Sequence, residues 1–362
     1  MQREPQKKTK KRDNGQAFCL WLILFMIFEV VLVIVVLTRT FKTADKPVET
    51  PSGEETTTDS EQPGDPVPSV PVFAGGTVPT LPAATSSTQT LTGISSQYAV
   101  LVNAETGEIV ASKNADTKFS PASLTKVMSL IVACEHLTQD DLNRKLVLTQ
   151  EITDYVKSGN YADASVALID GDKYLNDEFL IRDLLYGIGV SSAADCTYMI
   201  ALEVSGSETA FVDLMNRKAA EMGLTNTHFD NAIGYDSVEN YTTASEMAAI
   251  MAYAMQCNLI KDILAVREYY NYQGYYTENG VEKSYNRGFT STFQSRLNSY
   301  SSFRLTTVNL SAQKTGYTTS SYIVCAATGL QSKEQYILVL GDAEKLKGTM
   351  TDIETVYNTY AK

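Results

Sequence analysis

The stretch that decides the fold is Ser120-Pro-Ala-Ser-Leu-Thr-Lys126, followed directly by Val-Met-Ser-Leu-Ile-Val-Ala over residues 127–133. Ser120 can cap a helix, and Pro121 suits the first helical position because proline has the φ angle of a helix and no N–H to lose there. Residues 127–133 are apolar on nearly every face, and a helix of that kind is buried in its domain. The pattern predicts a central, buried helix that begins near Ser120.

Strands are predicted on both sides of this helix along the chain. Residues 98–103 and 109–112 flank the turn sequence Glu105-Thr-Gly-Glu108, which indicates a β-hairpin. Residues 322–328 and 335–340 form a second predicted pair, and the sequence between about 138 and 243 favours helices and loops. The order predicts an α/β domain of the α+β type, whose sheet joins the N- and C-terminal segments.

The last helix is predicted from an apolar stripe at helical spacing, formed by Met350, Ile353, Val356, Tyr357 and Tyr360. Thr351-Asp-Ile-Glu354 matches a capping box, in which a threonine and a glutamate satisfy each other's backbone N–H groups. We therefore expect the helix to begin there.

A membrane anchor is predicted at the N-terminus. Residues 17–38 are a run of 22 that is apolar apart from Glu29 and the last threonine, and about 20 apolar residues span a bilayer as a helix. Residues 1–16 carry a net charge of +4, which places this basic tail in the cytoplasm and the rest of the chain outside. A cleaved signal peptide is the alternative, but its apolar run is usually about 7–15 residues and ends at a small-residue site.

A linker is predicted over residues 39–93, because eight of the ten prolines lie between Pro47 and Pro82 among Thr, Ser, Glu and Gly. The folded domain would then occupy residues 94–362. The whole chain has a net charge of −12, and phosphate binding needs Lys and Arg, so a nucleic-acid partner is not expected.

The cysteines and histidines give no metal or cofactor pattern. The five cysteines form no C-x-x-C, and Cys134, Cys196 and Cys325 lie in apolar stretches typical of a core, so we expect buried free thiols. His136 and His228 are far apart in the sequence and fit no metal-ligand spacing. The sequence therefore predicts no metal and no cofactor.

The chemistry is concentrated in Ser123-Leu-Thr-Lys126, an S-x-x-K at the start of the predicted buried helix. Residues i and i+3 share a helix face, so the lysine amine can reach the serine hydroxyl. Serine needs a base to act as a nucleophile, and a lysine serves only when burial lowers its pKa enough to make it neutral. The N-terminal end of a helix also favours a developing negative charge.

A second S-x-x-K, Ser311-Ala-Gln-Lys314, precedes a predicted strand, where residues i and i+3 face opposite sides. This second match is therefore expected to be chance. Lys314-Thr-Gly316 itself is different, because we expect it to open the strand that ends at Thr328. On a strand, its ammonium and hydroxyl can bind a carboxylate, and the glycine lets a substrate backbone approach.

Taken together, four motifs resemble the D-alanyl-D-alanine carboxypeptidase family of low-molecular-weight penicillin-binding proteins. They are Pro121-Ala-Ser-Leu-Thr-Lys126, Leu184-Leu-Tyr-Gly187, Asn226-Thr-His-Phe229 and Lys314-Thr-Gly-Tyr-Thr318. The resemblance covers roughly residue 95 to the C-terminus. It implies the fold shared by DD-peptidases and β-lactamases, with an antiparallel sheet flanked by helices and a mostly helical subdomain.

The resemblance also implies an activity and a place. The activity is a serine-type hydrolase that removes the terminal D-alanine from peptidoglycan stem peptides and is acylated by β-lactams. The place is the outer side of a bacterial cell membrane, with the N-terminal helix as the tether.

Residue roles follow from the motif positions that match. The resemblance implies Ser123 as the acyl-ester nucleophile and Lys126 as the proton acceptor. Lys314 and Thr315 would hold the substrate carboxylate beside Gly316, and the backbone N–H groups of Ser123 and Tyr317 would form the oxyanion hole. Arg296 or Arg304 is a further candidate for the carboxylate.

The middle motif departs from the family pattern S-x-N. Here the chain has Ser191-Ser-Ala-Ala-Asp-Cys196, which puts Ser192 at the serine position and Ala194 at the asparagine position. Ser191 is an alternative register, with Ala193 in place of the asparagine. Either way the amide that would hold the substrate's acyl chain is missing, which we expect to cost about 1–3 kcal/mol of binding or rate. Asp195 is expected to support the helix.

Three other functions stay open from the sequence. A DD-endopeptidase would use the same residues. A β-lactamase of class A needs a glutamate in E-x-x-L-N, and Gln294 stands there before Leu297-Asn298. A non-catalytic wall-peptide-binding protein is favoured by Ala194 but opposed by the intact nucleophile and base.

Overall fold

The structure is a computed structural model that describes residues 70–158, 164–318, 322–330, 334–343 and 346–361. The predicted tail over 1–16, the predicted membrane helix over 17–38 and residues 39–69 of the predicted linker lie outside the described residues. Within the described ranges, every helix is too short or too polar to cross a bilayer.

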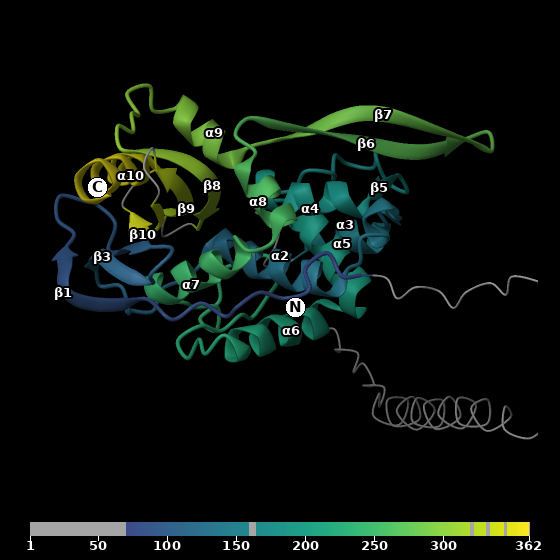
Figure 1. Cartoon of the computed structure of the whole chain (residues 1–362). Coiled ribbons are helices and arrows are strands. Elements are labelled where there is room, and N and C mark those ends of the chain that lie inside the picture. The colour runs from purple at the N-terminus through teal and green to yellow at the C-terminus, as the bar shows by residue number, and fades with distance from the viewer. Residues whose placement is uncertain (1–69, 159–163, 319–321, 331–333, 344–345, 362) are drawn as a thin grey trace, which may run out of the picture. The chain divides into compact units, whose positions relative to one another are not determined.

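A six-stranded sheet joins the two ends of the domain in the order β1-β3-β2-β10-β9-β8 (Figure 1). Its strands are β1 Ala83–Thr90, β2 Tyr98–Asn103, β3 Glu108–Lys113, β8 Val308–Tyr317, β9 Tyr322–Leu330 and β10 Gln335–Ala343. The predicted hairpin forms β2 and β3, and β2 pairs antiparallel with β10, with Leu101 opposite Leu338. The prediction that the sheet unites N- and C-terminal segments is confirmed.

The two faces of this sheet pack against different helices, as the two-residue period of a strand requires. In β2, Ala99 and Leu101 belong to the core under helix α10, Leu346–Tyr360. Val100 and Val102 belong to the core on the opposite face, which includes α2 and α7. Met350, Ile353, Val356 and Tyr357 of α10 are buried against this face of the sheet, as predicted.

Helix α2, Thr125–His136, is the central helix that the sequence predicts: every residue from Thr125 to Cys134 is buried. It contacts four other helices and one short turn (Figure 1). The other helices between α2 and β8 are α3 Gln150–Lys157, α4 Ile181–Val190, α5 Ala194–Ser205, α6 Glu208–Glu221, α7 Ala244–Ala254, α8 Asn258–Ala265 and α9 Thr292–Asn298, of which α4 to α7 contact α2. The helical subdomain beside the sheet, which the resemblance implies, is therefore present.

A second, four-stranded sheet has the order β4-β5-β6-β7, with β4 Lys145–Val147, β5 Glu178–Leu180, β6 Tyr269–Glu278 and β7 Val281–Thr290. The β6–β7 ribbon extends past α4 and α5 (Figure 1). Sequence analysis did not find these strands. Many of their tyrosines serve packing: Tyr270 stacks on Tyr186, and Tyr272 stacks on Phe289.

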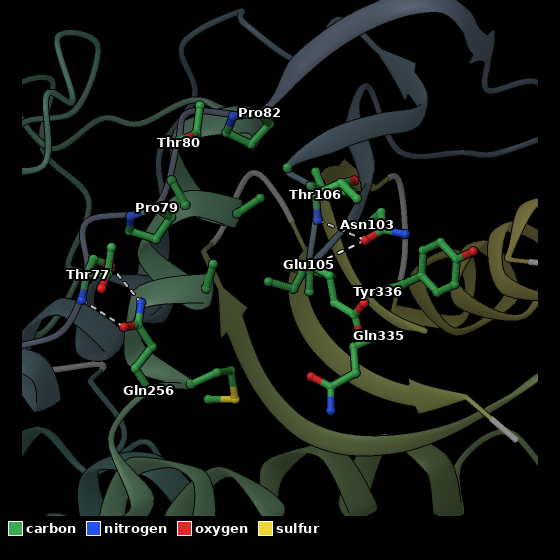
Figure 2. Close-up of a pocket in the computed structure, with 18 of the residues that line it drawn as sticks. Thr77, Pro79, Thr80, Pro82, Asn103, Glu105, Thr106, Gln256, Gln335 and Tyr336 are labelled. Atoms are coloured by element: carbon green, nitrogen blue, oxygen red, sulfur yellow. Dashed lines mark hydrogen bonds between the residues drawn. The ribbon is translucent and has the colours of Figure 1, made fainter. Parts of the chain in front are cut away.

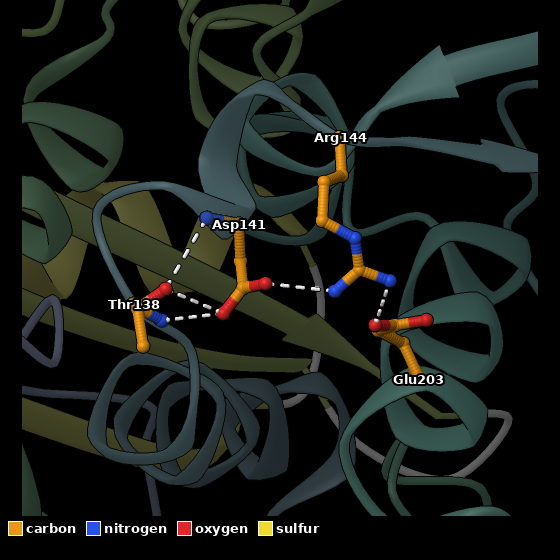
Figure 3. Close-up of polar contacts among 4 residues, drawn as sticks. All are labelled: Thr138, Asp141, Arg144 and Glu203. Atoms are coloured by element: carbon orange, nitrogen blue, oxygen red, sulfur yellow. Dashed lines mark hydrogen bonds and ion pairs between the residues drawn. The ribbon is translucent and has the colours of Figure 1, made fainter. Parts of the chain in front are cut away.

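A polar cluster ties the segment after α2 to helix α5 (Figure 3). Arg144 makes ion pairs of 2.7 Å with Asp141 and 2.6 Å with Glu203, and the Thr138 N–H and hydroxyl both donate to Asp141. The Thr138 and Arg144 hydrogen bonds lower the pKa of Asp141 to about 2. Because Arg144 is half exposed, the cluster positions the segment more than it stabilises the domain.

Three expected boundaries are wrong. The folded domain begins before residue 94, because Phe73 packs into the core and residues 83–90, assigned to the linker, form β1 beside β3. A polar segment can add to a sheet as an edge strand without a core of its own. Helix α10 begins at Leu346, so Thr351 and Glu354 lie inside it. Ser120 does not cap: its hydroxyl donates to Asp236.

The segment before β1 borders a cavity of about 430 Å³ between α7, β10 and the β2–β3 turn (Figure 2). Thr77 exchanges two hydrogen bonds with the Gln256 amide, and Asn103 accepts from the Glu105 and Thr106 N–H groups in the turn. The two Thr77 hydrogen bonds fix the segment before β1 to the turn that follows α7.

A buried carboxylate locks the chain before β2 to the last helix, and it yields a stability prediction. Asp352 of α10 is 2% exposed and accepts four hydrogen bonds, from the N–H and hydroxyl groups of Ser95 and Ser96. Asp352→Ala leaves those donors without an acceptor, so the free energy of unfolding should fall by about 3 kcal/mol.

Urea unfolding of the variant and the parent measures this change. Asp116→Ala, at an exposed position, is the control and should change the free energy of unfolding by less than about 0.5 kcal/mol. Equal stability of the Asp352 variant and the parent would contradict the prediction.

Candidate active site

Ser123 and Lys126 meet at the N-terminal end of α2. Ser123 lies in the 3₁₀ turn η2, Ala122–Leu124, which leads directly into the helix. The Lys126 Nζ lies 3.3 Å from the Ser123 Oγ. It also donates to the Ile233 carbonyl oxygen at 2.5 Å. The serine and its neighbouring amine are therefore in hydrogen-bond contact before any substrate binds.

Burial sets the charge of this amine. Lys126 is 3% exposed, and its desolvation lowers the pKa of the amine to about 7, against an opposing, raising effect of Asp195. A neutral lysine has two N–H bonds and one lone pair. With one N–H donated to Ile233, the lone pair can accept the Ser123 hydroxyl proton.

Ser192 is in contact with a second buried lysine, Lys314. Lys314 is 1% exposed, and its Nζ donates to the Ser192 Oγ at 2.9 Å and to the Thr315 carbonyl at 2.8 Å. The neighbouring Ser191 hydroxyl donates instead to the Thr290 carbonyl, at 3.2 Å. Of the two registers left open by the sequence, the geometry favours Ser192 at the serine position.

The Lys314-Thr-Gly316 motif lies near the end of β8, so the expectation that it opens a strand running to Thr328 is wrong. A Cβ on Gly316 would lie 3.2 Å from the Ser123 N and 3.1 Å from the Ala122 Cβ. The glycine therefore allows β8 to lie directly against the turn η2, Ala122–Leu124, which is called the catalytic turn below. On the same strand Ser311 is exposed while Lys314 is buried, so the two side chains of the second S-x-x-K lie in different surroundings.

A cavity of about 590 Å³ opens over these residues. Its lining includes Ser123, Lys126, Ser192, Thr315, Gly316 and Tyr317. The Lys314 side chain is not part of the lining, and it reaches the cavity through its contact with Ser192. The cavity of Figure 2 contains none of these side chains and has no paired nucleophile and base, so it is not the candidate active site.

Two hydroxyls and one guanidinium form another part of the cavity wall. The Thr292 and Thr315 hydroxyls lie 2.6 Å apart, and the Arg296 Nη2 donates to the Gly316 carbonyl at 2.7 Å. Arg296 lines the cavity. Arg304 is exposed, and its backbone N–H donates to Glu354 on α10. Of the two arginine candidates, only Arg296 is at the cavity. Sequence analysis missed Thr292, which belongs to no recognisable motif.

Strained backbone marks the same place. Among the described residues, six non-glycine residues have a positive φ, and four of them are Asn or Asp, which tolerate it. The other two are Ala122, with φ 46°, and Ser192, with φ 58°. Such strain persists where the surrounding structure holds it, commonly at functional sites.

Sequence analysis also missed the segment Asn231–Tyr235, which holds Lys126. The Asn231 Oδ1 accepts from the N–H groups of Gly234 and Tyr235, and the Ala232 and Ile233 carbonyls accept from Ser129 and Lys126 of α2. The Asn231-Ala-Ile-Gly234 spacing is a turn signal that could have drawn attention to it.

The remaining sequence candidates lie outside the chemistry. His228 Nδ1 contacts the Glu239 carbonyl at 2.6 Å, which is a structural role. Cys134, Cys196 and Cys257 are free and buried. The side chains of Cys19 and Cys325 lie outside the described residues.

Comparison with known proteins agrees with this fold. Residues 83–345 match the family model of D-alanyl-D-alanine carboxypeptidase. The chain is 32% identical over 206 residues to the D-alanyl-D-alanine carboxypeptidase of a Streptomyces species, a match covering 55% of this chain and 66% of that protein. It is 28% identical over 250 residues to DacA of Haemophilus influenzae, covering 68% and 57%.

Solved structures show the same fold. The crystal structure of a Streptomyces DD-transpeptidase aligns with a TM-score of 0.63 at 24% identity, covering 73% of this chain and 96% of that one. Penicillin binding protein 5 from Haemophilus influenzae aligns with a TM-score of 0.59 at 24% identity, covering 74% and 70%.

The fold is shared with the structures of a DD-transpeptidase and of a penicillin-binding protein. More narrowly, the chain belongs to the D-alanyl-D-alanine carboxypeptidase family, whose model matches most of its length. The matches to curated relatives span between 37% and 66% of the relatives' own length for the Bacillus subtilis, Streptomyces and Haemophilus influenzae proteins.

Gly234 gives the sharpest test of how the site is assembled. Its φ is 76°, and a Cβ there would lie 1.8 Å from the Ala122 carbonyl oxygen. Gly234→Ala should therefore displace the catalytic turn and slow acylation of Ser123 by at least about 100-fold, since small misplacements of reacting groups have effects of that size. The measurement is the second-order rate of labelling by a fluorescent penicillin.

Gly223→Ala is the matched control. Gly223 has a similar φ of 72° but nothing within 4 Å of the added Cβ, so its substitution imposes the backbone strain without the clash. Its labelling rate should stay within about twofold of the parent. Equal labelling rates for the two variants would show that contact with Ala122 is unimportant.

Proposed function

We propose that this chain is a serine-type D-Ala-D-Ala carboxypeptidase that trims peptidoglycan stem peptides through an acyl-enzyme on Ser123. The observation that carries the proposal is the contact of the Ser123 hydroxyl with a buried lysine whose pKa is about 7. A binding module has no need of a nucleophile paired with a base. Membership of the family supports the substrate class.

In the acylation step, Ser123 Oγ attacks the carbonyl carbon of the penultimate D-alanine while Lys126 accepts the hydroxyl proton. The negative charge that develops on the carbonyl oxygen would be stabilised by the Ser123 and Tyr317 backbone N–H groups. Ser192, in contact with Lys314, would pass a proton to the leaving amine of the terminal D-alanine. Breakage of that C–N bond leaves an ester on Ser123, which water then hydrolyses.

The substrate's terminal carboxylate fits the wall formed by Thr292, Thr315 and Arg296. Two hydroxyls and a guanidinium suit a carboxylate, because charge-assisted hydrogen bonds are stronger than neutral ones. Lys314 directly precedes Thr315 on β8, and its amine contacts Ser192. A free carboxylate at this position is what distinguishes a carboxypeptidase substrate from an internal peptide bond.

Slow release of β-lactams is expected from the composition of the cavity. Gln294, at the position of the water-activating glutamate in class A β-lactamases, is not among the lining residues. Of the described residues that line the cavity, Asp236 is the one carboxylate, and it accepts the Ser120 hydroxyl. The chain is therefore proposed as a target of β-lactams and not as a resistance enzyme.

The location rests on the sequence alone. The apolar run at 17–38 with Lys and Arg before it supports a single-pass anchor in a bacterial membrane, with the catalytic domain outside. That side of the membrane is where peptidoglycan is found.

Labelling and product release test the proposed function directly. The full chain should bind a fluorescent penicillin covalently at one site and release D-alanine from a pentapeptide that ends in D-Ala-D-Ala. Ser123→Ala should abolish both, because Ser123 is the hydroxyl in contact with the amine whose pKa burial lowers to about 7. No labelling of the parent would exclude the acyl-enzyme. Labelling with cleavage of cross-linked dimers into monomers, and with no D-alanine released from the pentapeptide, would favour an endopeptidase.

The pH profile tests the role of Lys126. Its pKa is lowered from 10.5 to about 7, and only the neutral amine is a base. The acylation rate constant at low penicillin concentration should therefore fall about tenfold per unit below pH 7 and be level above it, until other groups titrate. A midpoint at pH 9 or higher would mean that Lys126 is not the base.

A further inference from the structure

The wall of the cavity beside Ser192 lacks the amide that the family pattern supplies. Ala194 is fully buried at the start of α5 and is not among the lining residues. Its backbone N–H donates to the Ser165 carbonyl at 2.7 Å. Ala164 and Ser165 line the cavity, so the segment that contacts Ala194 also forms part of the cavity wall.

Ser165 brings a hydroxyl to that wall. It is exposed, and its Oγ lies 3.3 Å from the Ser191 carbonyl, to which it donates a long hydrogen bond. A serine hydroxyl has one donor and two acceptor lone pairs. Its acceptor capacity is therefore available to an N–H group in the cavity, and its weak donor bond can be exchanged for one to a substrate carbonyl.

Asp195 holds this segment in place. The carboxylate is fully buried and accepts hydrogen bonds from three successive N–H groups, those of Ala167, Leu168 and Ile169, at 2.7–3.2 Å. Asp195 follows Ala194 on α5, so the N-terminal end of this helix fixes the chain that carries Ser165. The hydroxyl is thereby positioned by a rigid element, as a specific contact requires.

We propose that the Ser165 hydroxyl hydrogen-bonds the peptide chain that precedes the D-Ala-D-Ala pair, and so replaces the amide that Ala194 lacks. This inference rests on the proposed function, since it concerns the substrate of the same cavity. It makes Ser165 a specificity residue: it distinguishes substrates with a peptide chain on the acyl side from those without one.

Two substrates separate this role from a structural one. The long substrate is a tripeptide with an acylated lysine before D-Ala-D-Ala, and the short one is N-acetyl-D-Ala-D-Ala. Ser165→Ala in the full chain should lower kcat/KM about tenfold for the long substrate, equivalent to about 1.4 kcal/mol, and less than twofold for the short one. Ser165→Thr keeps the hydroxyl and should retain most of the activity on the long substrate.

The control is Ser284→Ala, an exposed serine on β7 that is not part of the cavity lining. It should leave both substrates unchanged. An equal loss on both substrates, or no loss on either, would overturn the assignment of Ser165. Stoichiometric labelling by fluorescent penicillin is measured on the same samples: absence of labelling in the parent would defeat the proposed function itself, whereas normal labelling with no effect of Ser165→Ala would defeat only this inference.

Discussion

The site depends on one interaction: a lysine amine that the fold buries between a serine hydroxyl and a backbone carbonyl. In water this amine would be protonated and of no use as a base. Inside the domain, Lys126 loses its solvation, and its pKa falls to about 7. The Ile233 carbonyl then orients it towards Ser123. Three elements keep the Lys126 amine buried and oriented towards Ser123. They are helix α2, the edge strand β8 and the Asn231–Tyr235 segment.

That arrangement is held from several sides. Gly316 brings the end of β8 against the catalytic turn, and Gly234 brings the Asn231–Tyr235 segment against the same turn. Neither approach has room for a side chain. The strained φ angles at Ala122 and Ser192 fit this crowding. Strained backbone of this kind raises the free energy of the folded state, and it persists because the packing around it holds it in place.

Much of the fold and the main chemistry could be predicted from the sequence, because local patterns carry them. The apolar run after Lys126 predicted a buried helix, and Ser123-Leu-Thr-Lys126 owes its geometry to three-residue helical spacing. The β6–β7 ribbon was missed because its tyrosines and polar residues lack a clear alternation. Strand β1 was missed because its side chains are exposed and polar, and it gains order only by pairing with β3.

The parts of the site that depend on long-range contacts were not predictable in this way. Ile233 acts through its carbonyl, which has no sequence signature. Ser165 and Thr292 reach the cavity from loops or helix ends far from the motifs along the chain. Arg296 and Arg304 were equivalent in the sequence, and only the packing of α9 against β8 separates them.

The measurement that tests the central claim most directly is the titration of the Lys126 amine by NMR, in full chain labelled at the lysine side chains. Lys126→Arg, which should lose one resonance, provides the assignment. We predict an apparent pKa of about 7 for that resonance. An apparent pKa near 10.5, the value of a solvated lysine, would mean that Lys126 is charged at neutral pH and that the proposed base is wrong.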